Sequence, residues 1–381
     1  MIIRMIQLLR QKYIILFLWF TMSFVGHGFA DHSPKQLMRN FSAFSKLAET
    51  GMLGPFDVSV VKFGEFKKSQ SPMTYSDKYD YLFEDKFNLA AIIMNNDEVV
   101  YERYNLARSI DASTPLLGMS MSKTAASASI GVLLCQNEIL NLNDKAGVYS
   151  EFLRTTPYSE VKIRNILQMN SGVSPLGRAD EKKFNQKARG MQKYAGEASV
   201  REALNFYDVA AREQGTGMNY HSSDTLALSV LIEEISGMPL SQFFYEHIYT
   251  QFGQNNYMHW TSDELGTTVS FSDLVMSARD WINFGSYLMQ QKRDNTCLGA
   301  FFNEGVALSV ETGKKNGAKY GYQSWVFNIH ESPAMVLQGH GGQFLVLDEV
   351  TDTLLLTISI NERYKIGNLF KDIGAITEQL Q

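Results

Sequence analysis

The chain has 381 residues, a formal net charge of −5 at pH 7 and 45% hydrophobic residues. This length and composition are ample for a large core, in one big domain or two interlocked ones. The sequence contains no basic stripe with interleaved aromatic residues, so nucleic acid is not an expected partner.

The N-terminus has the layout of a secretory signal. Residues 1–12 carry three basic side chains and no acid, and residues 13–25 form an unbroken, mostly apolar run. Gly28 and Ala30 then place small residues at the −3 and −1 positions of a cut after Ala30. We therefore expect residues 1–30 to be a signal peptide and the mature protein, with a net charge of −8, to be periplasmic or secreted without a stable membrane span. An uncleaved N-terminal anchor is the alternative, although the apolar run is short for a spanning helix.

Cysteine and histidine usage predicts neither a metal site nor a cofactor. The seven histidines are scattered, with no pair at the spacing of metal ligands. Cys135 and Cys297 are the two cysteines, and Cys135 falls in an apolar segment. We expect Cys135 to be a buried free thiol, although export would permit a disulfide.

The N-terminal part is predicted to contain a helix and a hairpin. Residues 32–52 are amphipathic, and residues 55–85 show no clear period. Residues 87–95 and 98–104 are β-like and flank the turn sequence Asn95-Asn96-Asp97, which is typical of a hairpin.

The middle of the chain, residues 116–294, is predicted to be mainly helical. Its periodic segments end at turn residues such as Gly172 and Gly237. The first expected helix begins at Ser120. Further helices are expected at 161–169, 200–209, 223–235, 240–252 and in the last part of 267–291. Loops at about 173–198 and 250–270 are where we expect substrate selectivity to arise.

From residue 320 the pattern changes to strands. Four antiparallel strands are predicted, followed by a closing helix at 370–380; the strands are 320–327, 335–338, 343–348 and 353–360. We therefore expect an α/β (α+β) fold in a single domain, residues 31–381. Both chain ends, about 31–115 and 295–381, contribute to its antiparallel sheet, which is flanked by helices. An all-α subdomain is inserted in the sequence between these two parts.

Ser120-Met-Ser-Lys123 stands where a Pro-marked loop enters an apolar helix. Positions i and i+3 share a helix face, and a partly desolvated amine loses its proton more easily, so Lys123 could activate Ser120 as a nucleophile. The same spacing occurs at Ser59, in a strand-like run, and at Ser159, in a polar turn. A helix start that is merely rich in Ser and Thr is the structural alternative.

Two further segments complete a recognisable set. Tyr220-His-Ser222 lies about a hundred residues after Ser120, and His340-Gly341-Gly342-Gln343 lies between two predicted C-terminal strands. In this order the segments resemble the Ser-x-x-Lys, Tyr-x-Asn/Ser and Lys-Thr-Gly elements of the serine β-lactamase and penicillin-binding protein superfamily. The resemblance covers about residues 85–375 and is greatest to the class C-related branch, with its 6-aminohexanoate-dimer hydrolases and carboxylesterases. It implies a β-lactamase-like fold.

The resemblance also implies roles for individual residues. Ser120 would attack the substrate carbonyl, Lys123 would take up or relay its proton, and Tyr220 would act as general base and then protonate the leaving group. A phenol can serve as a base only if a cation stabilises its anion, and Lys123 is the candidate. The backbone N–H groups of Ser120 and Gln343 would form the oxyanion hole. Ser222 stands where the family has Asn or Ser.

The third element departs from the family pattern. His340, Gly341 and Gly342 replace Lys-Thr-Gly, whose Lys and Thr help to bind the carboxylate of a β-lactam in the family. A histidine can donate a hydrogen bond but is not a permanent charge at neutral pH. These three substrate-binding positions therefore favour an esterase or amide hydrolase over an efficient β-lactamase or transpeptidase.

Several of these residues also have structural interpretations. Tyr220 could be a core aromatic residue, and His340-Gly-Gly could be a glycine-rich turn. We assign Ser171-Gly172 to a helix end and Trp325 to strand packing. Asp180 and Glu181 fit a solvated acidic pair better than a pair of substrate contacts.

The expected function is that of an exported serine hydrolase, which cleaves a small-molecule ester or linear amide through an acyl-enzyme on Ser120. A D,D-peptidase or weak β-lactamase, and a non-catalytic binding module on the same fold, are the alternatives. An α/β-hydrolase elbow is disfavoured, because Gly118-Met-Ser120-Met-Ser122 ends in Ser and lacks a convincing preceding strand. No feature predicts the oligomeric state.

Overall fold

The computed structural model describes residues 59–64, 77–83, 87–139, 141–173, 200–206, 210–254, 257–263, 266–361 and 374. The expected signal peptide, the amphipathic segment 32–52, Asp180, Glu181 and most of the loop 173–198 lie outside the described residues. The same holds for the expected closing helix, of which only Gly374 is described, as helical.

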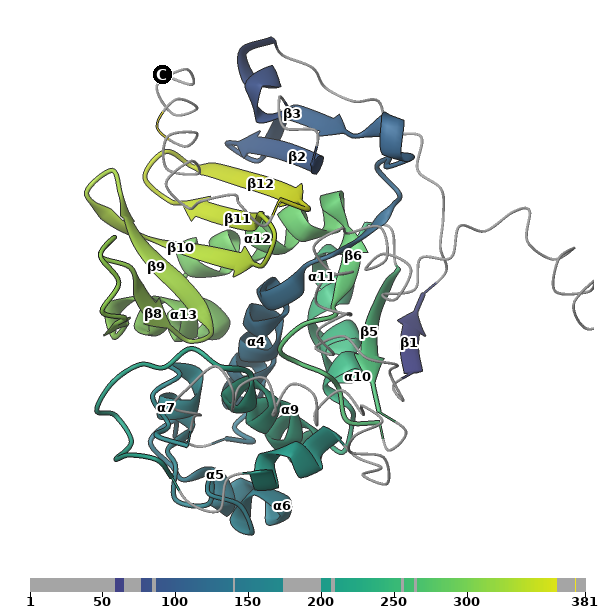
Figure 1. Ribbon diagram of the computed structural model, residues 1–381. Helices are drawn as coiled ribbons and strands as arrows, with labels where there is room; N and C mark the ends of the chain where they lie inside the picture. Colours follow the sequence, from purple (N-terminus) through teal and green to yellow (C-terminus); the bar gives the residue numbers. More distant parts are fainter. Residues whose placement is uncertain are drawn as a thin grey trace, which may run out of the picture.

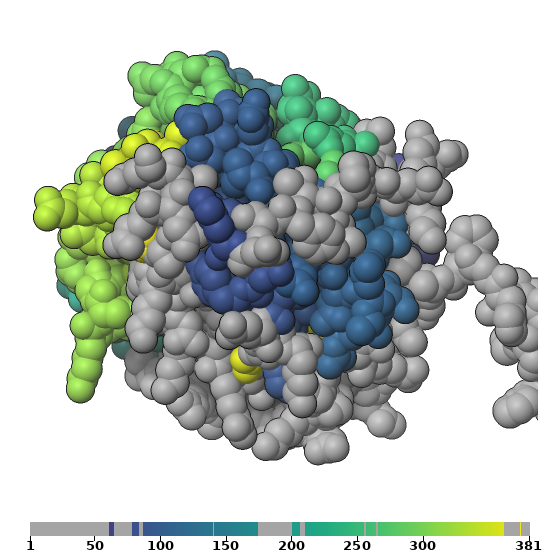
Figure 2. Space-filling view, turned by 90° about the horizontal axis from the view of Figure 1, so that it is seen from above, coloured from purple at the N-terminus to yellow at the C-terminus, as the bar shows by residue number. Residues whose placement is uncertain are grey.

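An antiparallel sheet of eight strands forms one layer of the molecule (Figure 1). The strand order is β3-β2-β12-β11-β10-β9-β8-β7. The strands are β2 (Asn88–Asn95), β3 (Glu98–Tyr104), β7 (Val310–Glu311), β8 (Lys319–Gly321), β9 (Ser324–Ile329), β10 (Ser332–Gly339), β11 (Gln343–Asp348) and β12 (Thr353–Ser359). Because β2 pairs with β12, the two ends of the chain meet in this sheet, as predicted, and blue and yellow segments share one face in Figure 2.

The β2–β3 hairpin follows the prediction from its turn sequence. Asn96 and Asp97 adopt left-handed backbone conformations, with φ of 49° and 63°. Asn and Asp tolerate this region better than other residues with a side chain, and such a turn matches the twist of the strands it joins.

The prediction of one strand over residues 320–327 is wrong, because a second hairpin turns at Tyr322-Gln323. Both residues have positive φ, 40° and 62°, without the Gly or Asn that would announce such a turn. Tertiary contacts hold it instead. The Gln323 side chain accepts a hydrogen bond from Thr225 Oγ1 (2.8 Å) and donates one to the Ile166 carbonyl (2.9 Å), while its own carbonyl accepts from Thr124 Oγ1 (3.0 Å).

A second sheet, with four strands in the order β1-β5-β6-β4, corrects the prediction of an all-α middle part. Its strands are β1 (Ser59–Phe63), β4 (Pro115–Leu117), β5 (Met258–Ser262) and β6 (Val275–Ser277). Strands β5 and β6 lie within the segment expected to be helical, and β5 lies inside the expected loop 250–270. They are short and buried at every position, so they carry no polar–apolar alternation that would reveal a strand.

Helices pack on both sheets and on one another (Figure 1). The α-helices are α4 (Ser122–Cys135), α5 (Ala146–Tyr149), α6 (Glu151–Arg154), α7 (Ile163–Leu167), α9 (Ser222–Ser236), α10 (Leu240–Phe244), α11 (Thr250–Phe252), α12 (Ala278–Arg293) and α13 (Cys297–Ala307). A π-helical turn, Tyr245–Tyr249, joins α10 to α11. The 3₁₀ segments are η1 (Asp77–Phe83), η2 (Leu106–Arg108), η3 (Met119–Met121) and η5 (Val200–Phe206).

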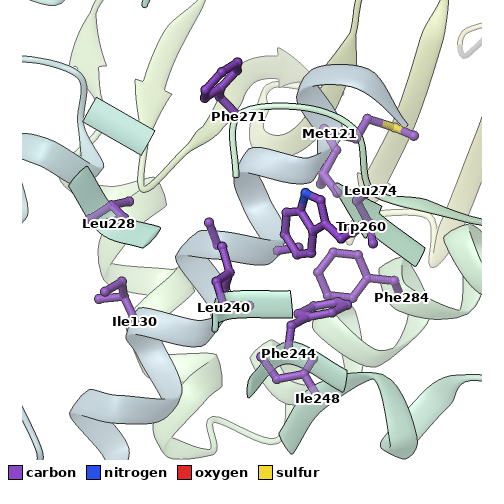
Figure 3. Close-up of a cluster of buried hydrophobic side chains, with 14 of the residues drawn as sticks. Met121, Ile130, Leu228, Leu240, Phe244, Ile248, Trp260, Phe271, Leu274 and Phe284 are labelled. Atoms are coloured by element: carbon purple, nitrogen blue, oxygen red, sulfur yellow. The ribbon is translucent and has the colours of Figure 1, made fainter. Parts of the chain in front are cut away.

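Helix α4 lies in the centre of the molecule. It is built from small and apolar residues on all sides, and such a helix is stable only where other elements cover every face. Figure 3 shows the surrounding cluster of buried side chains, which come from α9, α10, α12 and β5 as well as from α4 itself; the labelled members include Ile130, Leu228, Leu240, Phe244, Trp260 and Phe284. The turn that carries Ser120 therefore rests on a rigid base.

Cys135 and Cys297 form a disulfide, so the prediction of a free thiol is wrong. The bond joins the last residue of α4 to the first residue of α13, and the two Cα atoms are 5.8 Å apart. A separation of 162 residues gives no sequence signal for this pairing, which depends on α13 packing beside α4.

Removing the disulfide should lower the stability of the fold. The bond closes a long loop and so restricts the unfolded chain, and we expect the Cys135→Ala/Cys297→Ala variant to lose about 2–4 kcal/mol of unfolding free energy. Urea denaturation of the variant and of the oxidised and reduced wild-type protein measures the effect. The reduced wild-type protein should unfold at the same urea concentration as the variant. Coinciding curves for all three would contradict the prediction.

Candidate active site

Ser120 lies in η3, the tight turn between β4 and α4. Met119, directly before it, has φ of +50°, a strained conformation for a residue with a side chain. The Gly118 N–H donates to the Leu274 carbonyl (3.0 Å), and a Cβ at Gly118 would lie 2.1 Å from the Trp281 ring. Close packing therefore holds the strained turn. The structure also contains the preceding strand β4 that the sequence did not predict, but β4 pairs antiparallel with β6, unlike the parallel strand of an α/β-hydrolase elbow.

Ser122 supports this turn from inside. Its hydroxyl donates to the Met119 carbonyl (2.6 Å) and accepts from the Leu274 N–H (3.2 Å), and its side chain is fully buried. Ser120, by contrast, is half-buried. Of the two serines in the motif, Ser120 is therefore the one that a substrate can approach.

Lys123 lies near Tyr220, the residue with which the family resemblance pairs it. The lysine is 2% exposed, and its Nζ donates to the Phe271 carbonyl (3.1 Å). The Nζ atom lies 5.4 Å from the centroid of the Tyr220 ring and 5.4 Å from that of the Phe271 ring. An amine held in this way is largely removed from water and is close to the face of the phenol ring.

Tyr220 packs in an aromatic cluster with Tyr320 and Trp325. Its ring stacks on Trp325 with a centroid distance of 5.4 Å and meets Tyr320 edge-on at 5.7 Å. Tyr320 and Trp325 face each other across the β8–β9 hairpin. Burial raises the pKa of Tyr320 well above its usual value, and negative charge on Tyr220 or Asp224 would raise it further. Tyr320 therefore stays neutral and acts as a support for Tyr220, which is 37% exposed.

A buried polar network anchors the segment next to Tyr220. Asp224, in the first turn of α9, accepts hydrogen bonds from Tyr158 (2.8 Å) and Ser171 (2.6 Å). His221 Nε2 lies 3.3 Å from the other carboxylate oxygen of Asp224. Ser171, which we assigned to a helix end, thus also ties that end to the helix that follows Tyr220.

The third element reaches the Ser120 turn through Gly339, the last residue of β10. A Cβ at Gly339 would lie 2.4 Å from the Gly118 carbonyl oxygen, so this backbone approach requires glycine. Gly341 and Gly342 have φ of 90° and 95°, which explains the glycine pair as a turn. Gln343 opens β11 directly after this turn, is fully buried, and donates from Nε2 to the Ser359 carbonyl (3.0 Å).

The structure thus gathers most of the predicted site residues in one region. Ser120 lies in η3 and Lys123 in the first turn of α4, the Tyr220 ring lies over the Lys123 amine, and Gly339 leads the third element to the same turn. Ser222 is the first residue of α9 and is 9% exposed, and His340 is exposed at the β10–β11 turn.

Sequence reasoning missed two contributors to this site and assigned Trp325 to packing alone. Phe271 acts through its carbonyl, and Tyr320 supports Tyr220 through a hairpin that carries no Gly or Asn signal. Among the described residues, no group of three or more His, Cys, Asp or Glu side chains could hold a metal ion. None of the described helices has the length and apolar character needed to cross a membrane.

Comparison with solved structures finds the same fold in several hydrolases and penicillin-binding proteins. A protein from Bacillus anthracis, provisionally named 6-aminohexanoate-dimer hydrolase, is 19% identical, with a TM-score of 0.72 over 92% of this chain and 95% of that chain. An octameric penicillin-binding protein homologue from Pyrococcus abyssi is 15% identical, with a TM-score of 0.60 over 80% of this chain and 75% of that chain. A family VIII carboxylesterase is 12% identical, with a TM-score of 0.57 over 79% of this chain and 98% of that chain. These similarities show the fold.

No curated protein matches the sequence at a significant level. The family model described as Beta-lactamase, however, matches residues 84–380. Together with the antiparallel sheet and the flanking helices, this match confirms the predicted β-lactamase-like fold. The chain belongs to the Beta-lactamase family, the superfamily of serine β-lactamases and penicillin-binding proteins, whose members are typically serine hydrolases.

Proposed function

We propose that the protein is a serine hydrolase that cleaves a small-molecule ester or linear amide through a covalent acyl-enzyme on Ser120. The observation that carries this proposal is the approach of Lys123 to Tyr220, with Nζ 5.4 Å from the ring centroid, beside the strained turn that presents Ser120. A buried amine, a phenol and a half-buried serine are the groups that acyl transfer through a lysine–tyrosine base system requires.

In this mechanism Ser120 Oγ attacks the substrate carbonyl carbon, and its proton passes to the base formed by Lys123 and Tyr220. The negative charge on the tetrahedral intermediate is held by the backbone N–H groups of Ser120 and Gln343. Tyr220 then returns the proton to the leaving oxygen or nitrogen, which leaves an ester between Ser120 and the acyl group. Water, deprotonated by the same base, hydrolyses this ester and restores Ser120.

The replacement of Lys-Thr-Gly by His340-Gly341-Gly342 favours esters and linear amides over β-lactams. His340 is exposed, and the two glycines supply a turn but no side chain to hold a carboxylate. D,D-peptidase or weak β-lactamase activity is the second candidate, because the fold is shared with a penicillin-binding protein homologue and the first two motifs resemble those of that superfamily.

We also propose that the protein is exported, to the periplasm or outside the cell. The disulfide between Cys135 and Cys297 supports an oxidising compartment, and the residues 1–30 have the composition of a signal peptide. N-terminal sequencing of the exported protein checks cleavage after Ala30.

The proposed activity is tested by intact-mass spectrometry of the protein after incubation with a fluorophosphonate and with a panel of esters, linear amides and β-lactams. We expect one adduct per chain, mapped by digestion to the peptide that contains Ser120. A stable penicillin adduct or nitrocefin hydrolysis, with esters left intact, would favour the second candidate. A folded protein that gains no adduct from any reagent would instead be a non-catalytic binding module.

A further inference from the structure

Lys314 lies beside the candidate active site, although no sequence motif includes it. It belongs to the turn between β7 and β8, and its Nζ is 3.9 Å from the centroid of the Trp325 ring. The Trp325 ring in turn stacks on Tyr220, with 28° between the ring planes. One ammonium group, that of Lys123, therefore approaches Tyr220 directly, and a second lies one aromatic ring away.

The charge of Lys314 is not neutralised by a carboxylate within the described part of the chain. Other lysines there do form ion pairs, namely Lys145 with Glu160, Lys292 with Glu349 and Lys319 with Glu311. Partial burial lowers the pKa of Lys314, which is the direction expected for an amine packed on an indole without a paired acid. Because the residue is still exposed, an anion from solution can reach its ammonium group.

The contact with Trp325 fixes the place of this charge. A lysine on the surface normally samples many rotamers, but an ammonium group on an indole face is attracted by the ring and remains there for more of the time. Trp325 itself is 5% exposed and belongs to β9, which is paired on both sides with β8 and β10, so it provides a rigid support. The cation is thus positioned relative to Tyr220.

We propose that Lys314 is a specificity-determining residue that binds a carboxylate of the substrate, so that the enzyme prefers esters or amides carrying a second, anionic group. This inference rests on the proposed hydrolase function and names its substrate class. The cation comes from the β7–β8 turn, whereas the residues at the β10–β11 turn, His340-Gly341-Gly342, include no lysine.

A purely structural role is the competing explanation, because the aliphatic stem of a lysine can cover an aromatic ring without using its charge. Two substitutions separate these roles. Lys314→Met keeps an unbranched apolar side chain on Trp325 and removes the charge, and Lys314→Arg keeps both the charge and the ability to stack. Lys315→Met is the matched control, because it removes an exposed positive charge from the neighbouring position.

The test uses two chromogenic esters that differ in one charge, p-nitrophenyl hydrogen glutarate and methyl p-nitrophenyl glutarate. In the full-length wild-type protein the anionic ester should have the higher kcat/KM. Lys314→Met should reduce kcat/KM for the anionic ester roughly tenfold, mainly through KM, and leave the neutral ester within about twofold, because one charge at this range changes binding by that order. Lys314→Arg and Lys315→Met should keep the preference, and added salt should weaken it in the wild-type protein.

If Lys314→Met left the ratio of kcat/KM for the anionic ester to that for the neutral ester unchanged, the proposal would be overturned. If, in addition, both kcat/KM values fell equally, Lys314 would be assigned to packing alone. If the wild-type protein hydrolyses neither ester and Ser120 gains no adduct, the proposed hydrolase function fails separately. Calorimetric titration with sodium glutarate then tests separately whether Lys314 binds a carboxylate. Binding that weakens in Lys314→Met and persists in Lys315→Met supports the site, and equal binding by all three proteins rejects it.

Discussion

Ester hydrolysis should fall by roughly 10³-fold or more when Ser120 is replaced by alanine, because removal of the nucleophile leaves only the binding groups and the oxyanion hole. Labelling by a fluorophosphonate should disappear in the same variant. The measurement is kcat for the best ester of the panel, together with the intact mass of the labelled protein. The fold should be unaffected, since Ser120 is half-buried and the turn is held by Ser122, Gly118 and Trp281.

Ser127→Ala is the matched control for this variant. Ser127 lies on the same helix and is fully buried, and its hydroxyl has no hydrogen-bond partner among the described residues. Removing this hydroxyl should leave both activity and stability close to wild type. Ser122 is unsuitable as a control because its two hydrogen bonds brace the turn. Undiminished labelling of Ser120→Ala would place the nucleophile elsewhere.

Tyr220→Phe should reduce the rate of acylation by roughly 10²–10⁴-fold, the usual range for the loss of a general base. The substitution removes only the hydroxyl group, and the ring can keep its stacking on Trp325 and its edge contact with Tyr320. The folded state and its stability should therefore change little. Stopped-flow measurement of p-nitrophenol release in the first turnover separates acylation from later steps.

His340→Ala should cost less than about tenfold in the same experiment. His340 is exposed at a turn whose shape is set by Gly341 and Gly342, so its removal should affect only the proposed substrate contacts and leave the proposed proton transfer from Ser120 intact. A histidine within reach of a serine is nevertheless a common base in hydrolases. If His340→Ala abolished acylation while Tyr220→Phe retained it, the roles of the two residues would have to be exchanged.

The sheet could be predicted where the signals are local. Asn96 and Asp97 announce the β2–β3 hairpin by residue type, and Gly237, with φ of 70°, ends α9 where the sequence placed a stop. The same local logic placed the start of the central helix at Ser120, two residues before α4 begins at Ser122. In these places the preference of a few adjacent residues agrees with the global fold.

Features that depend on distant partners could not be predicted. The turn at Tyr322-Gln323 is stable because Gln323 finds partners on three helical segments, and β5 is a strand because its neighbours cover every side chain. The pairing of Cys135 with Cys297 likewise depends on helices that meet only in the folded chain. No window of sequence contains this information.

For the site, the resemblance of three short motifs supplied the candidate residues, and the structure supplied their arrangement. The resemblance pairs Lys123 with Tyr220, but the elements that hold the two side chains close together lie outside the motifs. Phe271 holds the amine through a backbone carbonyl, which any residue type could provide. The position of Lys314 on Trp325 also has no sequence signal, because it depends on the β8–β9 hairpin.

The tip of that hairpin gives the candidate site a mechanical property. Gln323 is hydrogen-bonded both to Thr124, one residue after Lys123, and to Thr225, five residues after Tyr220. The hairpin therefore sets the spacing between the segments that carry the two proposed base groups. Any movement that separates α4 from α9 must first break these bonds. Transplanting the three motifs into another scaffold without this hairpin would therefore carry over the chemistry but not its alignment.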